Sequence, residues 1–218
     1  MVAAVILAGG RSSRMGHDKA LISFGAETLL QRTCRVALAC ADTVYVVTPW
    51  CDRYRSLVPD SVQFIEEKPS PGAAATFHGP LMALVQALSW LHQCPEATPP
   101  WVLALACDMP NLSAATLNLW RSDLDTIPSS YLAYLPQRQH RWEPLCGFYR
   151  MAALGPLRQY ATAATTPEAR VGSKGPSLQA WLNLHPVQTI ASVDAALLAN
   201  LNTPAELEAW QQARRPPC

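Results

Sequence analysis

The sequence predicts an α/β fold, a doubly wound and mostly parallel sheet with helices on both faces. Short apolar runs alternate along its 218 residues with segments of helical spacing, which is the order of βαβ units. The runs are continuous, as in strands that are buried on both faces of a parallel sheet. Half of the residues are hydrophobic and 15% are charged, so the chain can cover such a sheet on both sides.

The first half of the chain provides the clearest elements. Four apolar runs are predicted to be strands, at residues 2–7, 43–47, 62–65 and 101–106. Helices are expected at 28–38 and 80–91, where apolar residues recur at helical spacing and Pro80 suits a first turn. Ser113 suits the N-cap of a further helix because its hydroxyl can accept a backbone N–H.

The second half is less regular. Two further strands, 131–135 and 145–149, flank the polar loop 137–141 and suit a hairpin-like pairing. The stretch from Ala161 to Pro176 is rich in Ala, Thr, Gly and Pro, which predicts a mobile loop. Beyond it we expect a short helix, a strand and a closing helix, at 177–182, 187–190 and 204–214. No internal repeat or linker divides the chain, so residues 1–218 are expected to form one domain.

Composition argues against several classes of protein. The net charge is +1 and no basic stripe is present, so no nucleic-acid partner is expected. No apolar run approaches the roughly 20 residues of a spanning helix, and the first apolar run lacks the basic flank of a signal peptide. The seven cysteines are odd in number and contain no C-x-x-C pair, so reduced thiols are expected rather than disulfides or a zinc site. We therefore expect a cytoplasmic protein without membrane contact.

A glycine-containing, basic loop follows the first strand directly, with the sequence LAGGRSSRMGHDK from Leu7 to Lys19. Gly9 and Gly10 allow backbone N–H groups to approach a ligand closely. Arg14 and Lys19 add positive charge, which together with backbone donors is what a polyphosphate requires. The spacing fits neither the dinucleotide fingerprint nor the P-loop. The alternative is a turn whose charges are solvated.

Asp108 follows the strand predicted at 101–106 directly. A carboxylate at a strand end can hold Mg²⁺ while phosphates and water supply the remaining oxygens. Since ligands bind beyond the carboxyl ends of parallel strands, Lys19 and Asp108 are expected to lie near each other. The alternative is an ordinary turn or N-cap aspartate.

The opening loop closely resembles the signature L-A-G-G-x-S-x-R-M-G-x-D-K of the nucleotidyltransferase superfamily that includes the molybdenum cofactor guanylyltransferases. The stretch C-D-M-P at 107–110 is a second specific match. Three further matches are individually weak and gain by their order: G-P-L at 79–81, E-P-L at 143–145 and N-x-N-T-P at 200–204. The resemblance implies a Rossmann-like nucleotidyltransferase fold. It further implies that residues 1–112 mainly bind the nucleotide and residues 113–218 mainly bind the acceptor.

The resemblance also assigns residues to roles. The nucleotide would be bound by Leu7, Ala8, Gly9, Gly10, Lys19, Glu67 and Asp108. Arg14, Lys19 and Asp108 would be catalytic, with Asp108 the Mg²⁺ ligand. Glu67 stands where the family has Asp, and a longer insert, 68–78, separates it from Gly79. Asn200 and Asn202 would face the acceptor, while Thr203 and Glu206 are explained by a capping box.

The reaction that the resemblance implies is transfer of GMP from GTP to the phosphate of molybdopterin, or of Mo-molybdopterin, with release of pyrophosphate. Mg²⁺ would be the cofactor, and the molybdenum-insertion and molybdoenzyme proteins would be transient partners. A sister enzyme that uses CTP or another NTP with a pterin, sugar or alcohol phosphate is the first alternative. Cytidylyl relatives tend towards L-A-A-G and D-Q-P, whereas Ala8-Gly9-Gly10 and Asp108-Met109-Pro110 favour guanine. A catalytically silent nucleotide-binding adaptor on the same fold is the second alternative.

Overall fold

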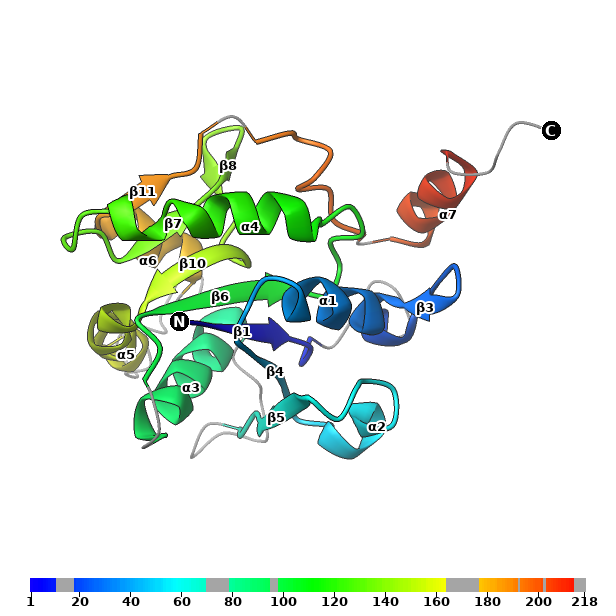
Figure 1. The fold of residues 1–218 in the computed structure, drawn as a ribbon, viewed down its shortest axis with the longest axis horizontal. Helices are drawn as coiled ribbons and strands as arrows, with labels where there is room; N and C mark the ends of the chain where they lie inside the picture. Colours follow the sequence, from blue (N-terminus) through cyan, green and yellow to red (C-terminus); the bar gives the residue numbers. More distant parts are fainter. Residues whose placement is uncertain are drawn as a thin grey trace.

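The computed structural model describes residues 1–10, 18–69, 79–94, 98–163, 177–191, 193–201 and 203–213. Their centre is a seven-stranded sheet in the order β11-β7-β10-β6-β1-β4-β5 (Figure 1). The strands are β1 (Val2–Leu7), β4 (Thr43–Thr48), β5 (Val62–Glu66), β6 (Trp101–Ala106), β7 (Ala133–Leu135), β10 (Cys146–Arg150) and β11 (Val187–Thr189). All pairings in this sheet are parallel except those of β10 with β6 and β7, so the predicted mostly parallel sheet is confirmed.

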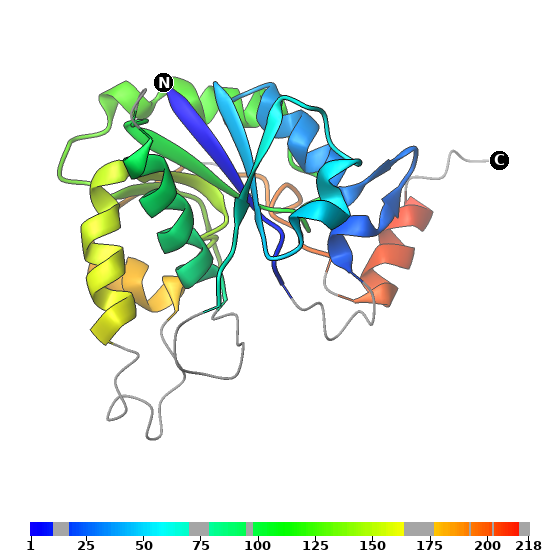
Figure 2. The ribbon, with the colours of Figure 1, turned by 90° about the horizontal axis from the view of Figure 1, so that it is seen from below.

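Helices cover both faces of the sheet, as expected for a doubly wound fold (Figure 2). They are α1 (Leu29–Leu38), α2 (Cys51–Arg55), α3 (Pro80–Gln93), α4 (Ala114–Ser122), α5 (Leu154–Ala163), α6 (Leu178–Leu184) and α7 (Pro204–Ala213). Two clusters of buried residues form the core, and both include residues of the strands. One also contains residues of α1, α2 and α4, and the other contains residues of α3, α5 and α6. Successive side chains of β1 alternate between the clusters, with Ala4 and Ile6 in the first and Ala3 and Val5 in the second.

Local sequence explains where several helices begin. Thr28 caps α1 in a reciprocal capping box with Gln31, and the Ser113 hydroxyl accepts from a backbone N–H of α4. Pro80 is the first residue of α3, a position where its missing N–H has no cost. Gly79, directly before it, has a φ of +76°, which glycine adopts without strain.

Two expectations for the second half need correction, and two helices of the chain were not anticipated. Residues 161–163, predicted as part of a mobile loop, form the last turn of α5, and residues 164–176 lie outside the described part of the chain. The polar loop 137–141 is itself a small hairpin of β8 (Gln137–Arg138) and β9 (Arg141–Trp142). The helices α2 and α5 were not anticipated. The predicted pairing of the strands on either side of the hairpin is confirmed, since β7 and β10 are antiparallel neighbours.

Candidate active site

The predicted site residues that the structure describes gather at the carboxyl edge of the sheet. Because β1, β4, β5 and β6 are parallel, their last residues lie side by side, with Leu7 paired to both Val47 and Ala106. Backbone pairing continues one residue further: Ala8 N–H donates to the Val47 carbonyl at 2.9 Å, and Glu67 N–H donates to the Thr48 carbonyl at 3.0 Å. The glycine pair, Glu67 and Asp108 therefore emerge from neighbouring strands at one edge.

Gly9 and Glu67 lie in direct contact. The Glu67 side chain is buried, with 5% of the residue exposed, and its Oε2 occupies the space that a Cβ on Gly9 would fill. The same Cβ would also lie 3.1 Å from Pro49 Cδ. Burial raises the pKa of Glu67 to about 6. Only glycine at position 9 leaves room for a carboxyl group at this place.

Lys19 and Asp108 form an ion pair across the site. Lys19 Nζ lies 3.1 Å from Asp108 Oδ2, and the two side chains are 17% and 20% exposed. Lys19 is the first residue of the short 3₁₀ helix η1 (Lys19–Leu21), whereas Asp108 follows β6. The structure thus brings together the two residues that the sequence predicted to lie near each other. Their charges neutralise each other in a place that water still reaches.

Asp18 fixes the position of Lys19, a role that the sequence analysis did not assign. Its Oδ1 accepts from Ala20 N–H at 3.1 Å as the N-cap of η1. Its Oδ2 accepts from the Tyr54 hydroxyl at 2.6 Å and from Arg53 Nη1 at 3.0 Å. Tyr54 is fully buried on α2, so η1 is tied to the body of the domain. The D that precedes K in the signature that the loop resembles was the available signal.

The C-terminal segment reaches the same place. Leu201 N–H donates to the carbonyl of Asp108 at 2.9 Å, and Leu201 packs against Leu29 of α1. Next to it, Asn200 Oδ1 is buried without a hydrogen-bond partner among the described residues. A buried amide oxygen of this kind usually needs a partner, which a bound ligand can provide. Because Leu201, the next residue, bonds to the backbone of Asp108, Asn200 lies close to the residue predicted to bind the metal.

The closing helix α7 begins as predicted. Thr203 and Glu206 exchange hydrogen bonds between side chain and backbone, at 2.9 and 3.2 Å, in the expected capping box. Trp210 Nε1 donates to Asn111 Oδ1 at 3.1 Å and so attaches α7 near the loop after Asp108. In Figure 1, α7 lies beyond the arrowhead end of β1. Arg14 and Asn202 lie outside the described residues.

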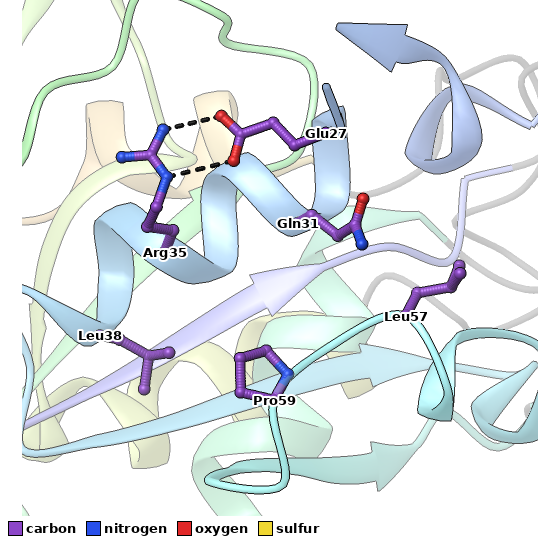
Figure 3. A pocket seen from close by; sticks show the side chains of 6 residues that line it. All are labelled: Glu27, Gln31, Arg35, Leu38, Leu57 and Pro59. Atoms are coloured by element: carbon purple, nitrogen blue, oxygen red, sulfur yellow. Dashed lines mark hydrogen bonds and ion pairs between the residues drawn. The ribbon is translucent and has the colours of Figure 1, made fainter. Parts of the chain in front are cut away.

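A separate pocket of about 410 Å³ lies between α1 and the segment that follows α2 (Figure 3). It is lined by Glu27, Gln31, Arg35, Leu38, Leu57 and Pro59. Its polar rim is an ion pair, with Arg35 Nη2 at 2.7 Å from Glu27 Oε1. None of the predicted site residues lines this pocket. Within the part of the chain that the structure covers, no helix combines the length and apolar character needed to cross a membrane.

A glycine pair, a lysine and an aspartate lie at the carboxyl edge of a doubly wound sheet. This combination of fold and site is typical of nucleotide-binding α/β proteins. Residues 4–175 match the family model of the MobA-like NTP transferase domain. The chain therefore belongs to the MobA-like NTP transferase family.

Relatives and solved structures agree with this assignment. The chain is 41% identical over 208 residues to a probable molybdenum cofactor guanylyltransferase of Trichormus variabilis, covering 95% of this chain and 89% of that protein. It is 39% identical over 209 residues to one of Synechococcus elongatus, covering 96% and 97%. Molybdopterin-guanine dinucleotide biosynthesis protein A from Archaeoglobus fulgidus has the same fold, with a TM-score of 0.70, 17% identity and 97% coverage of both chains.

Proposed function

We propose that this protein transfers GMP from GTP to the terminal phosphate of molybdopterin, or of its molybdenum form, and releases pyrophosphate. The observation that carries the proposal is the Lys19–Asp108 pair at the carboxyl edge, beside Gly9 and Glu67. The names of the similar curated proteins support GTP and a molybdopterin acceptor as the substrates. Such transfer requires positioning and charge neutralisation rather than a covalent intermediate on the protein.

The nucleotide half of the proposed site consists of backbone and charge. The backbone from Leu7 to Gly10 would hold the base and ribose, with Glu67 as a further contact in the space that Gly9 leaves. Lys19 and Arg14 would bind the triphosphate, since cations and backbone N–H groups are the partners that phosphate oxygens require. Anchoring of Asp18 by Tyr54 would keep the Lys19 side chain directed at the phosphates.

The chemistry of Asp108 fits a divalent cation that arrives with the nucleotide. Among the described residues no group of three or more His, Cys, Asp or Glu side chains gathers as a metal site. One carboxylate completed by phosphate oxygens and water is how Mg²⁺ is commonly held in nucleotide sites. When bound there, Mg²⁺ would neutralise charge on the α-phosphate and the leaving pyrophosphate. Rv0371c from Mycobacterium tuberculosis, a protein of the same fold, has been solved as a complex with manganese.

The acceptor would bind on the side of Asp108 where Asn200 lies, opposite to the proposed nucleotide side. Asn200 lies one residue before the Leu201 N–H that bonds the Asp108 backbone, and its buried Oδ1 has capacity for a ligand donor. We propose that Asn200 and Asn202 contact the pterin. We further propose that the protein acts in the cytoplasm and meets the molybdenum-insertion and molybdoenzyme proteins transiently.

The test is turnover of a nucleotide panel. Purified protein with Mg²⁺ and molybdopterin is mixed separately with GTP, CTP, ATP and UTP, and released pyrophosphate is measured. We expect turnover with GTP; turnover with CTP instead would transfer the proposal to the sister cytidylyl activity. Asp108→Asn should lower the rate by about 10³-fold or more while the protein stays folded.

The matched control is Asp60→Ala, which removes an exposed carboxylate just before β5, at the opposite edge of the sheet. It should retain wild-type turnover. A silent nucleotide-binding adaptor would show no pyrophosphate release with any nucleotide, and Asp108→Asn would then leave its function unchanged.

A further inference from the structure

Lys19 forms an ion pair with the Asp108 carboxylate, the group that the proposed function assigns to the metal. The ion pair with Asp108 is 3.1 Å long and its side chains are four-fifths or more buried. The position of the Lys19 backbone is fixed, because the N-cap Asp18 and its hydrogen bonds with Tyr54 and Arg53 hold the start of η1. The ion pair is therefore not a random contact of an exposed side chain. A cation is therefore built into the site before any ligand binds.

An ammonium group and a divalent cation compete for one carboxylate. Each is stabilised by the same negative charge, and two cations held within a few ångströms of each other repel strongly where water is partly excluded. A triphosphate changes the balance, since it offers Lys19 other anionic oxygens.

We propose that Lys19 holds Asp108 in place of a divalent cation in the ligand-free protein, so that the cation enters only once an anionic ligand has drawn Lys19 away. The proposal rests on the proposed function in that a nucleoside triphosphate is the ligand. Its consequence is coupled binding, in which nucleotide and metal each raise the affinity of the site for the other by the same factor. The free protein would then not accumulate metal at Asp108.

Binding of Mn²⁺ alone to the full-length protein, without nucleotide, tests this directly. Free Mn²⁺ is measured by its electron paramagnetic resonance signal during titration of wild type, Lys19→Met and Lys19→Gln. Both substitutions keep a side chain of similar length and remove the positive charge. The second variant keeps the test valid if the first fails to fold. We expect each to bind one Mn²⁺ about tenfold more tightly than wild type, within the range of ordinary coupling between sites.

Three controls assign the effect. Lys19→Arg keeps the positive charge and should bind Mn²⁺ as weakly as wild type. Arg35→Met breaks a different ion pair, the one between Arg35 and Glu27 at 2.7 Å, and should also bind as wild type does. Adding Asp108→Asn to Lys19→Met removes the carboxylate that would bind the cation, so the affinity should fall to the wild-type level or below it.

The proposal is overturned if neither uncharged variant binds Mn²⁺ more tightly, or if the gain survives loss of the Asp108 carboxylate. Neither result depends on turnover. Absence of pyrophosphate release from GTP would refute the proposed function, whereas the Mn²⁺ titration would still report on competition at Asp108.

Discussion

Single residues decide the shape of the proposed nucleotide side of the site, and Gly9 is the clearest case. Its lack of a side chain gives the buried Glu67 carboxyl group a place beside Pro49. Gly9 and Glu67 therefore act as a unit, and a change at either one is expected to affect the other.

Gly9→Ala should destabilise the fold by about 1–3 kcal/mol, because the added methyl group overlaps with the Glu67 carboxyl group and approaches Pro49. It should also weaken GTP binding, since Glu67 must move. Urea unfolding and calorimetric titration measure the two effects. Gly10→Ala is the stability control, because a Cβ there would meet no described residue within 4 Å. Equal stability of the two variants would contradict the expected overlap.

Glu67 should make stability depend on pH. Burial raises its pKa to about 6 in the folded protein, above the ordinary 4.5, so the folded state binds the proton more tightly than the unfolded state. The corresponding stability is present below about pH 4.5 and is lost as pH rises through about 6, by roughly 1–2 kcal/mol. Urea unfolding of wild type and Glu67→Gln between pH 4 and 7 measures it. The difference in the free energy of unfolding between the two proteins should change between pH 4 and 7. A constant difference would show that the pKa of Glu67 is not raised.

At the scale of elements, α2 supports η1 although it is only five residues long. Tyr54→Phe removes the hydroxyl that donates to Asp18 and leaves Arg53 as its remaining side-chain donor among the described residues. We expect a loss of about 1–3 kcal/mol in stability and weaker GTP binding, because Lys19 follows Asp18 directly. Thermal unfolding and calorimetry measure these effects. Tyr45→Phe is the control, since Tyr45 is buried against Trp90 and its hydroxyl makes no hydrogen bond to another described residue.

The contact between β10 and β7 depends on a glycine. A Cβ at Gly147 would lie 2.7 Å from both the Tyr134 carbonyl oxygen and Leu135 Cδ2. Gly147→Ala should therefore separate the strands and cost about 1–3 kcal/mol. Gly155→Ala, in α5 with nothing within 4 Å of the new methyl group, should instead stabilise by up to about 1 kcal/mol. Chemical denaturation of both variants gives opposite signs if the packing is as described.

At the scale of the whole molecule, the cysteines report on the integrity of the core. Burial raises the pKa of Cys34 and Cys107 to about 12 and that of Cys40 to about 11. Their reactive thiolates are therefore nearly absent at neutral pH. Labelling with a thiol reagent should be slow for these residues in the native protein, and all seven cysteines of the sequence should react after denaturation. Rapid native labelling of all seven would contradict a compact core.

The elements that could be predicted are those whose signal is local. The strands β1, β4 and β6 are apolar runs buried on both faces, whereas β5 is an edge strand in which only some residues are buried. The predicted ends of all four lie within about a residue of those observed. The helix α5 was missed because Gly155 and Pro156 resemble a turn, whereas a proline in the first turn of a helix replaces no intrahelical bond. The helix α2 was missed because five residues show no period and Trp50 provides no side-chain cap.

The sequence by itself determined the fold class, the family and most of the candidate site, because glycines, charges and strand ends have local signatures. Only the tertiary structure decided that β10 pairs antiparallel with β6, that Glu67 fills the space at Gly9, and that Leu201 bonds to Asp108. The order of the strands predicted that Lys19 and Asp108 are near each other, but only the structure gives the direct ion pair between these residues, which are 89 positions apart. The physical reason is that strand direction and contacts between distant residues depend on packing of the whole chain, which no local pattern specifies.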